Sequence, residues 1–257
     1  MELASLTNDV LVFLFMAAFV AGFLDTLAGG GGLIALPALI MCGIPPLLAL
    51  GTNKLQGTMG TATASLMMFR LRKVSLRDVR TPMLFAFLGS VAGSVAVQFV
   101  NTEVLVFVIP AILLLIAVYF IFSPFIRLKK TGPRLSRRRY EKTVVPLIGW
   151  YDGMFGPGTG SFFALAGVSL QGKGLIDATA VAKTLNFATN IASLGVFLLV
   201  GKVVWSAGLV MMVGQVAGAW AGAKCLVRIN PAALRLLVVI MCLGMLCKYA
   251  LSLGWFG

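Results

Sequence analysis

Two short stretches of this chain each place a single aspartate beside a cluster of glycines, inside sequence that is otherwise strongly apolar. Asp25 precedes Gly29-Gly30-Gly31-Gly32, and Asp152 precedes Gly153, Gly156, Gly158 and Gly160. Of the eight acidic residues, only Asp25 and Asp152 lie well inside apolar segments. A carboxylate in an apolar medium is costly unless it is paired or hydrated, and glycines interrupt helices. Because both costly features occur twice, they predict a functional site.

Two lysines in similar polar surroundings are the expected partners of these aspartates. Lys54 lies in Gly51-Thr52-Asn53-Lys54-Leu55-Gln56, and Lys183 lies in Ala182-Lys183-Thr184-Leu185-Asn186. Within each half of the chain, Asp25 is predicted to come close to Lys54, and Asp152 to Lys183. An alternative interpretation is that each pair only neutralises its own charges and fixes the helix breaks.

Ammonium groups, amides, hydroxyls and free backbone N–H groups at helix starts together favour a small oxyanion as the ligand. The predicted substrate-binding residues are Lys54, Lys183, Thr52, Asn53, Gln56, Asn186, Asn190, Gly30, Gly31, Gly158 and Thr159. Asp25 and Asp152 are predicted to act in coupling or gating, by releasing a lysine to the substrate or by taking up a proton. The alternative role of the glycines is close helix packing, which fits Gly89, Gly93, Gly214, Gly218 and Gly222 better because of their four-residue spacing.

The composition indicates that the surroundings of these residues are apolar, since 60% of the chain is hydrophobic and only 11% is charged. Val104 to Phe125 and Leu234 to Leu253 are almost continuously apolar, and each reaches the about 20 residues that cross a bilayer as a helix. A transmembrane β-barrel would instead show alternating segments of about ten residues. The sequence therefore predicts an all-α polytopic membrane protein.

Several classes of function are disfavoured by what the sequence lacks. The chain has no histidine, which removes histidine-based triads and metal sites. Its four cysteines lack metal-ligand spacing, and its carboxylates are not clustered. We therefore expect that the protein is not an enzyme and that it binds no metal and no cofactor. The net charge of +13 is concentrated in two basic stretches near residues 70–80 and 126–142 rather than on a folded face, so nucleic acid is not an expected partner.

The polar motifs belong to a longer internal repeat. Matches recur in order along the chain at offsets of 127, 125 and 129 residues, and they include Gly22 with Gly149, Asp25 with Asp152, Gly89 with Gly214, Lys54 with Lys183 and Asn101 with Asn230. We predict membrane repeat 1 at residues 8–126, a basic cytoplasmic linker at 127–142 and membrane repeat 2 at 143–254.

The distribution of charge favours an inverted relation between the repeats. The loop around Lys73 carries five basic residues, whereas the loop around its repeat mate Lys202 carries one; around the Asn101 and Asn230 turns the bias is the other way. Short basic loops stay in the cytoplasm. Loops 70–80 and 126–142 are therefore predicted to be cytoplasmic, and the N-terminus to lie outside. Anionic lipid is a further expected contact of the basic linker.

An inverted repeat needs an odd number of membrane segments in each half. In the first half, Val10 to Ala28 and Pro46 to Phe69 read as full spans, and Leu33 to Met41 is too short to cross unaided. We expect a half-length or re-entrant helix there, giving five segments in each repeat. Eight plain spans remain the alternative.

The motifs quoted above, together with Tyr151-Asp152-Gly153-Met154-Phe155-Gly156-Pro157-Gly158-Thr159-Gly160-Ser161 and Gly201-Lys202-Val203, resemble those of the sulfite exporter TauE/SafE family of membrane permeases. The resemblance covers both repeats. It implies a multi-pass permease of the prokaryotic inner membrane that moves sulfite, sulfonates or related organosulfur anions, powered by an ion gradient. An anion channel and a membrane scaffold or assembly factor without transport activity are the alternatives, and a homodimer is left open.

Overall fold

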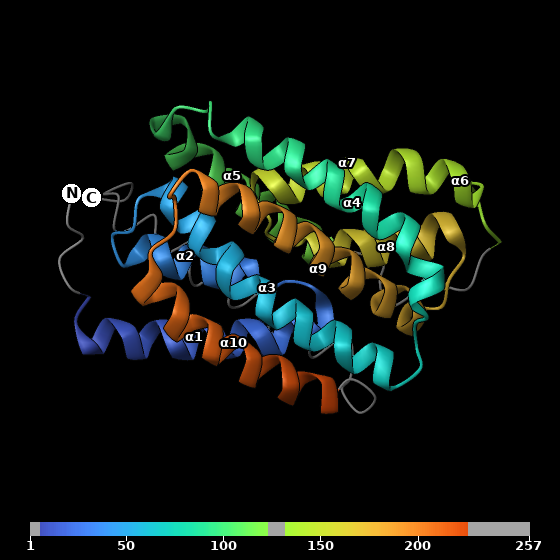
Figure 1. Ribbon diagram of the computed structural model, residues 1–257, viewed down its shortest axis with the longest axis horizontal. Coiled ribbons are helices and arrows are strands. Elements are labelled where there is room, and N and C mark those ends of the chain that lie inside the picture. The colour runs from blue at the N-terminus through green and yellow to red at the C-terminus, as the bar shows by residue number, and fades with distance from the viewer. Residues whose placement is uncertain (1–5, 123–131, 226–257) are drawn as a thin grey trace.

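The structure is a computed structural model that describes residues 6–122 and 132–225, and every regular element in these residues is a helix (Figure 1). The helices are α1 (Asn8–Ala28), α2 (Gly32–Met41), α3 (Pro46–Arg70), α4 (Leu76–Val97), α5 (Thr102–Phe122), α6 (Arg137–Arg139), the π-helical turn η2 (Tyr140–Val144), α7 (Val145–Met154), α8 (Thr159–Gln171), α9 (Leu175–Leu199) and α10 (Trp205–Cys225). The prediction of an all-α fold is therefore confirmed for the described residues.

The first half contains five helices, and the second of them is short, as the sequence predicts. With 10 residues, α2 is about 15 Å long, which is half of a hydrocarbon core of about 30 Å. Gly29 ends α1 in the left-handed conformation with a φ of 80°. In the second half, α7 and α8 are separated by a similar break at Gly156 and Gly158, whose φ angles are 96° and 78°. Both glycine clusters therefore interrupt helices.

Helices from the two halves pack in pairs. In Figure 1, α3 and α9 lie in the middle of the molecule, α1 and α10 lie below them, and α4 and α7 lie above. The faces in contact are rich in glycine: a Cβ on Gly218 would lie 1.9 Å from the main-chain oxygen of Phe19. A Cβ on Gly93 would lie 2.0 Å from the main-chain oxygen of Trp150. The predicted close packing of these small-residue faces is confirmed.

The contacts between helices also give their relative directions. Gly214, Gly218 and Gly222 of α10 face Phe15, Phe19 and Phe23 of α1 in the same order, so these two helices run parallel. At the centre, Gly51 of α3 lies against Lys202, whereas Ser65 donates a hydrogen bond to the main-chain oxygen of Lys183. The order is reversed, and α3 and α9 therefore run antiparallel.

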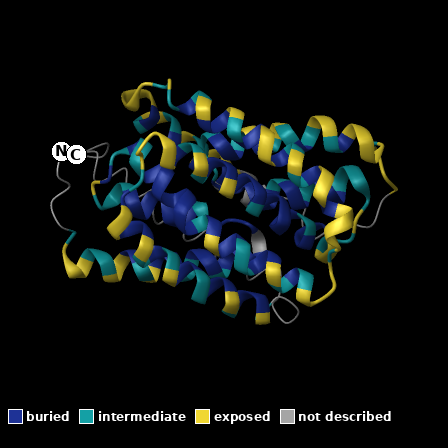
Figure 2. Ribbon diagram, in the orientation of Figure 1, coloured by how far each residue is buried: buried dark blue, intermediate teal, exposed yellow. Residues whose placement is uncertain are grey.

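The pattern of buried and exposed residues is typical of a protein that lies in a membrane. Figure 2 shows the dark blue buried residues concentrated along α2, α3 and α9, with exposed positions on the outer helices. Large apolar side chains such as Leu84, Leu115 and Val213 are more than half exposed. Within the described residues, α1, α4, α9 and α10 are long and apolar enough to cross a membrane. The 25-residue helix α3 would be about 37 Å long, sufficient to cross as well, but it carries a polar, buried face.

One predicted feature differs from the structure, and others lie outside the described residues. Residues 137–142, which we expected in the linker, form α6 and the start of η2 and lead without a break into α7, because Ser136 begins the helix by accepting a hydrogen bond from the N–H of Arg139. The Asn230 turn, the apolar segment Leu234 to Leu253 and linker residues 127–131 lie outside the described residues.

Candidate functional site

The two helix breaks contact each other at the centre of the molecule. A Cβ on Gly29 would lie 2.4 Å from the main-chain carbon of Gly160, and a Cβ on Gly32 would lie 3.2 Å from the Cα of Pro157. Such an approach between backbones leaves no room for a side chain. Segments that are far apart in the sequence, each beside its own aspartate, are thereby combined into one site.

Two buried ion pairs connect the halves across these breaks. Lys54 Nζ of α3 lies 2.9 Å from Asp152 Oδ1, and the exposed fractions of the two side chains are 1% and 2%. Lys183 Nζ of α9 lies 3.6 Å from Asp25 Oδ2, with exposed fractions of 1% and 8%. The prediction that each aspartate pairs with the lysine of its own half is therefore wrong. The pairs are crossed because α3 and α9 pack against each other and the two helix breaks meet, so that each lysine reaches the break of the other half.

Each lysine also caps the C-terminal end of a broken helix. Lys183 Nζ donates to the main-chain oxygen of Asp25 near the end of α1, and Lys54 Nζ donates to the main-chain oxygen of Asp152 near the end of α7. The carbonyl end of a helix carries a partial negative charge that favours a cation. In this conformation both ammonium groups are therefore occupied by protein oxygens.

The two carboxylates in turn hold the beginning of the next helix. Asp25 Oδ1 accepts a hydrogen bond of 3.2 Å from the N–H of Gly31, just before α2. Asp152 Oδ1 accepts one of 2.9 Å from the hydroxyl of Thr159, the first residue of α8. The aspartates thus connect the two sides of each break, at equivalent places in the two halves.

A small polar cavity lies between the two breaks, and we call it the central cavity. Its volume is about 20 Å³, which is room for roughly one water molecule. The lining residues are Asp25, Gly29, Gly32, Asn53, Lys54, Gln56, Gly57, Thr61, Asp152, Gly156, Asn186, Asn190 and Gln215. An oxyanion with several heavy atoms requires more space, so this conformation is closed around the site.

Three buried acceptor atoms at the central cavity have no hydrogen-bond partner among the described residues. They are Gln56 Oε1, Asp152 Oδ2 and Gln215 Oε1. An unsatisfied buried acceptor costs free energy, and all three would accept from a donor. In the closed conformation the walls of the cavity are therefore suited to a proton, a water molecule or a cation.

The structure brings seven of the predicted site residues to the central cavity: Asp25, Asn53, Lys54, Gln56, Asp152, Asn186 and Asn190. Lys183, Gly31 and Thr159 contact an aspartate but do not line the cavity. Thr52 is elsewhere, because its hydroxyl accepts from the N–H of Val204 at 2.9 Å and so joins α3 to the start of α10. Gly30 and Gly158 are buried outside the lining, and a Cβ on Gly158 would meet Ile116 at 3.1 Å.

Gln215 is a lining residue that the sequence interpretation missed. It lies on α10, is 2% exposed, and would contact a Cβ placed on Gly60. The available signal was a lone amide in the middle of an apolar helix, which in a membrane protein marks a buried polar contact. Thr61, one turn beyond Gly57 on α3, was missed because it lies beyond the quoted motif.

Residues 14–249 match the family model described as sulfite exporter TauE/SafE. The chain belongs to the TauE/SafE family. The match covers both helix breaks and both lysines, so the resemblance seen in the motifs extends over nearly the whole chain.

Relatives within the TauE/SafE family carry transporter names. A probable membrane transporter protein of Haemophilus influenzae is 44% identical over 248 residues, covering 96% of this chain and 97% of the relative. The probable membrane transporter protein YfcA of Escherichia coli K12 is 41% identical over 240 residues, covering 91% and 87%. ORF9 of a Sinorhizobium species, with the same description, is 46% identical over 219 residues, covering 85% and 84%. No solved structure matches this chain.

Family membership and the apolar helices together identify a multi-pass membrane transporter. Within the described ranges, no group of three His, Cys, Asp or Glu side chains is placed to hold a metal ion. The site described here is instead a set of charged and amide groups between two helix breaks.

Proposed function

We propose that this TauE/SafE protein is a secondary transporter of small oxyanions, with sulfite, sulfonates or other organosulfur anions as substrates, coupled to an ion gradient. The observation that carries the proposal is the pair of crossed ion pairs, Lys54 with Asp152 and Lys183 with Asp25, beside a closed polar cavity. An anion that enters between the breaks competes with the carboxylates for the ammonium groups. Opening of the pairs and binding of substrate are then the same event.

The same geometry supports protons as the coupling ion. When an anion takes a lysine, the released aspartate is left as an unpaired buried charge, which is costly. Uptake of a proton removes that cost. Asp152 is the better placed of the two carboxylates, because its Oδ2 already lacks a hydrogen-bond partner among the described residues. We propose that substrate and proton move together through protonation of Asp152.

The two halves are proposed to be inverted repeats in the inner membrane. The antiparallel course of their equivalent helices α3 and α9 supports this relation, as do the equivalent roles of Asp25 and Asp152. Binding at the meeting point of discontinuous helices is a common plan of such transporters. In this arrangement loops 70–80 and 126–142 face the cytoplasm and the N-terminus lies outside.

Transport in proteoliposomes tests the proposal. Purified protein is supplied with sulfite, thiosulfate, an alkyl sulfonate and chloride, with and without a pH gradient, and uptake is compared with that of Lys54→Gln and Lys183→Gln. We expect the wild type to move at least one sulfur oxyanion faster when a pH gradient is imposed. Each lysine variant should insert into the membrane normally but lose more than about nine-tenths of the transport rate. A tenfold loss corresponds to about 1.4 kcal/mol of interaction free energy. A wild type that moves and binds none of these anions rejects the proposal.

Two alternatives are distinguished in the same preparation. A channel would show no acceleration by substrate on the opposite side of the membrane, whereas a carrier that must return its site is accelerated by it. A scaffold without transport activity would show neither flux nor dependence on Lys54 and Lys183.

A further inference from the structure

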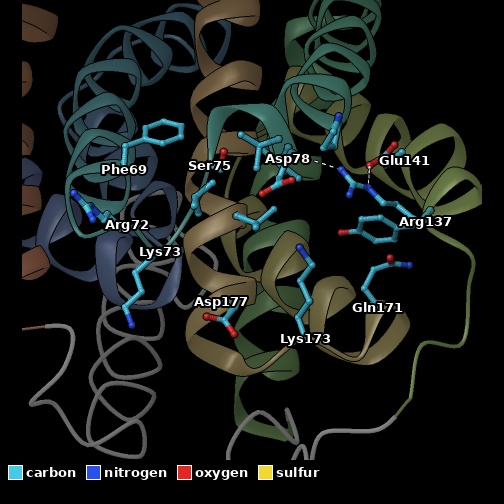
Figure 3. A pocket seen from close by; sticks show the side chains of 16 residues that line it. Phe69, Arg72, Lys73, Ser75, Asp78, Arg137, Glu141, Gln171, Lys173 and Asp177 are labelled. Carbon is cyan, nitrogen blue, oxygen red and sulfur yellow. Dashed lines mark hydrogen bonds and ion pairs between the residues drawn. The ribbon is translucent and has the colours of Figure 1, made fainter.

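A second pocket, with a volume of about 610 Å³, is separate from the central cavity. It opens between the C-terminal end of α3, the beginnings of α4 and α9, and the α6–η2 segment (Figure 3). Both halves of the protein contribute to its wall. We call this pocket the inner vestibule, because loop 70–80, proposed to be cytoplasmic, forms part of its rim.

The rim of the inner vestibule is charged, with one positive charge in excess, and all of its charged residues except the partly buried Glu141 are exposed. Its cations are Arg72, Lys73, Arg137 and Lys173, and its carboxylates are Asp78, Glu141 and Asp177. Arg137 is held in place, since its Nε donates to Glu141 at 2.7 Å and its Nη2 donates to the main-chain oxygen of Asp78 at 2.7 Å. The hydrogen bond to Glu141 raises the pKa of Arg137, so this cation is permanent.

Lys173 and Lys73 carry the ammonium groups of the rim. Figure 3 shows Lys173 extending from the α8–α9 turn toward Asp78 and Arg137, and it forms no ion pair with any described residue. Burial, followed by the charge of Arg137, lowers the pKa of Lys173. Lys73 stands at the edge of the pocket and likewise has no ion pair within the described residues. Both cations are therefore available to an anion from solution.

The floor of the inner vestibule is apolar, with Val79, Pro82 and Leu185 buried, and α9 extends from it to the central cavity. Leu185, which is 0% exposed, lines the floor, and the next residue, Asn186, lines the central cavity. On the facing helix, Ser65 Oγ bonds to the main-chain oxygen of Lys183 at 2.9 Å, one turn before the floor residue Phe69. Both α3 and α9 therefore run from the inner vestibule to the central cavity.

We infer that the inner vestibule collects the transported oxyanion on the cytoplasmic side and delivers it to the central cavity past Leu185. This inference rests on the proposed function. The rim supplies a local excess of positive charge, which raises the concentration of an anion near the opening. The apolar floor excludes water and ions from the ion pairs until the two halves move. Arg137 stays with Glu141, whereas Lys73 and Lys173 exchange solvent for substrate.

The test measures the half-saturating sulfite concentration from each face of oriented proteoliposomes. The variant is Lys73→Gln with Lys173→Gln, and the matched control is Arg138→Gln with Lys142→Gln, which removes two exposed cations of the same region that do not line the pocket. We expect the half-saturating concentration at the cytoplasmic face to rise about tenfold in the variant, as loss of about 1.4 kcal/mol would give, with the value at the opposite face and the maximal rate unchanged. The control and the variant Lys73→Arg with Lys173→Arg should behave as the wild type.

The outcomes separate this inference from the proposed function. If the wild type transports sulfite but the glutamine variant has the wild-type value at both faces, or an equal rise at both, the vestibule is not a collecting site and the proposed function still stands. If the wild type moves no oxyanion, both are rejected. If omitting anionic lipid reproduces the change in the wild type, the pocket binds a lipid headgroup and the inference is overturned. Should the double variant fail to insert, Lys73→Gln and Lys173→Gln are measured separately, each with a smaller expected rise.

Discussion

Lys54 Nζ lies 2.9 Å from Asp152 Oδ1, although 98 residues separate them in the sequence. Its counterpart, Lys183 with Asp25, bridges 158 residues. Neither half of the protein neutralises its own aspartate. Any movement that separates α3 from the break in the other half must therefore expose a buried charge, and this connects the position of the halves to the occupancy of the site.

The crossed pairing predicts a specific pattern of non-additivity. Lys54→Met should lower the free energy of unfolding by about 3 to 5 kcal/mol, because Asp152 is left as an uncompensated buried charge. Adding Asp152→Asn should recover a substantial part of this loss. The measurement is a double-mutant cycle from denaturant unfolding in detergent micelles.

The control for this cycle combines Lys54→Met with Asp25→Asn, the pairing within one half. Since Asp25 contacts Lys183 rather than Lys54, the coupling energy of this pair should be clearly smaller than that of Lys54 with Asp152. Coupling of Lys54 to Asp25 and not to Asp152 would contradict the crossed arrangement.

Glycines on the paired helix faces are expected to be intolerant of even one methyl group. In Gly218→Ala the new Cβ would lie 1.9 Å from the main-chain oxygen of Phe19, so α1 and α10 must separate, at a cost of about 1 to 3 kcal/mol. In the matched variant Gly195→Ala, nothing lies within 4 Å of the new Cβ. Because alanine favours a helix more than glycine does, this variant should be more stable than the wild type by about 0.5 to 1 kcal/mol. Thermal unfolding in detergent measures both; equal effects would show that the contact is absent.

The proposed inverted topology predicts that cysteines at Lys73 and Lys202 react from opposite faces of the membrane. Lys202 contacts Gly51 near the beginning of α3 and Lys73 follows the end of this helix, so about 30 Å of helix separates them. The measurement uses impermeant thiol reagents on intact and permeabilised cells, with Cys42 and the other native cysteines replaced. If both positions were labelled from the same side, α3 would not cross the membrane and the inverted topology would be contradicted.

The lowered pKa of Lys173 gives a pH dependence with a defined sign. Burial and Arg137 lower this pKa from its ordinary value of 10.5, outweighing the opposite effects of Asp177, Asp78 and Glu141. A lysine is charged below its pKa, so as the cytoplasmic pH rises Lys173 loses its charge earlier than an ordinary lysine. Affinity for the oxyanion at that face should then weaken at alkaline pH.

Lys173→Arg is the matched variant, because arginine keeps its charge throughout this range. Its half-saturating concentration at the cytoplasmic face should stay nearly constant where that of the wild type rises. Identical alkaline profiles of the two proteins would assign the effect to another group.

The helix breaks were predictable from local sequence alone. Glycine clusters beside Asp25 and Asp152 cannot continue a helix in an apolar medium without exposing backbone groups, and residues 33–41 are too few to cross a bilayer. The five helices of the first half follow from these constraints. Asn53, Gln56, Asn186 and Asn190 were predicted as site residues because they accompany Lys54 and Lys183 in the sequence and their amides can donate to an anion, and all four line the central cavity.

Tertiary structure decided which lysine meets which aspartate, and it added Gln215 to the site. Sequence spacing favours pairing within a half, since Lys54 is only 29 positions from Asp25, but partners of buried charges are chosen by helix packing rather than by distance along the chain. The sequence determined that two charged breaks exist and that each needs a cation. Only the tertiary packing, in which α3 lies antiparallel to α9 and the glycines of the two breaks bring their backbones into contact, made them one site.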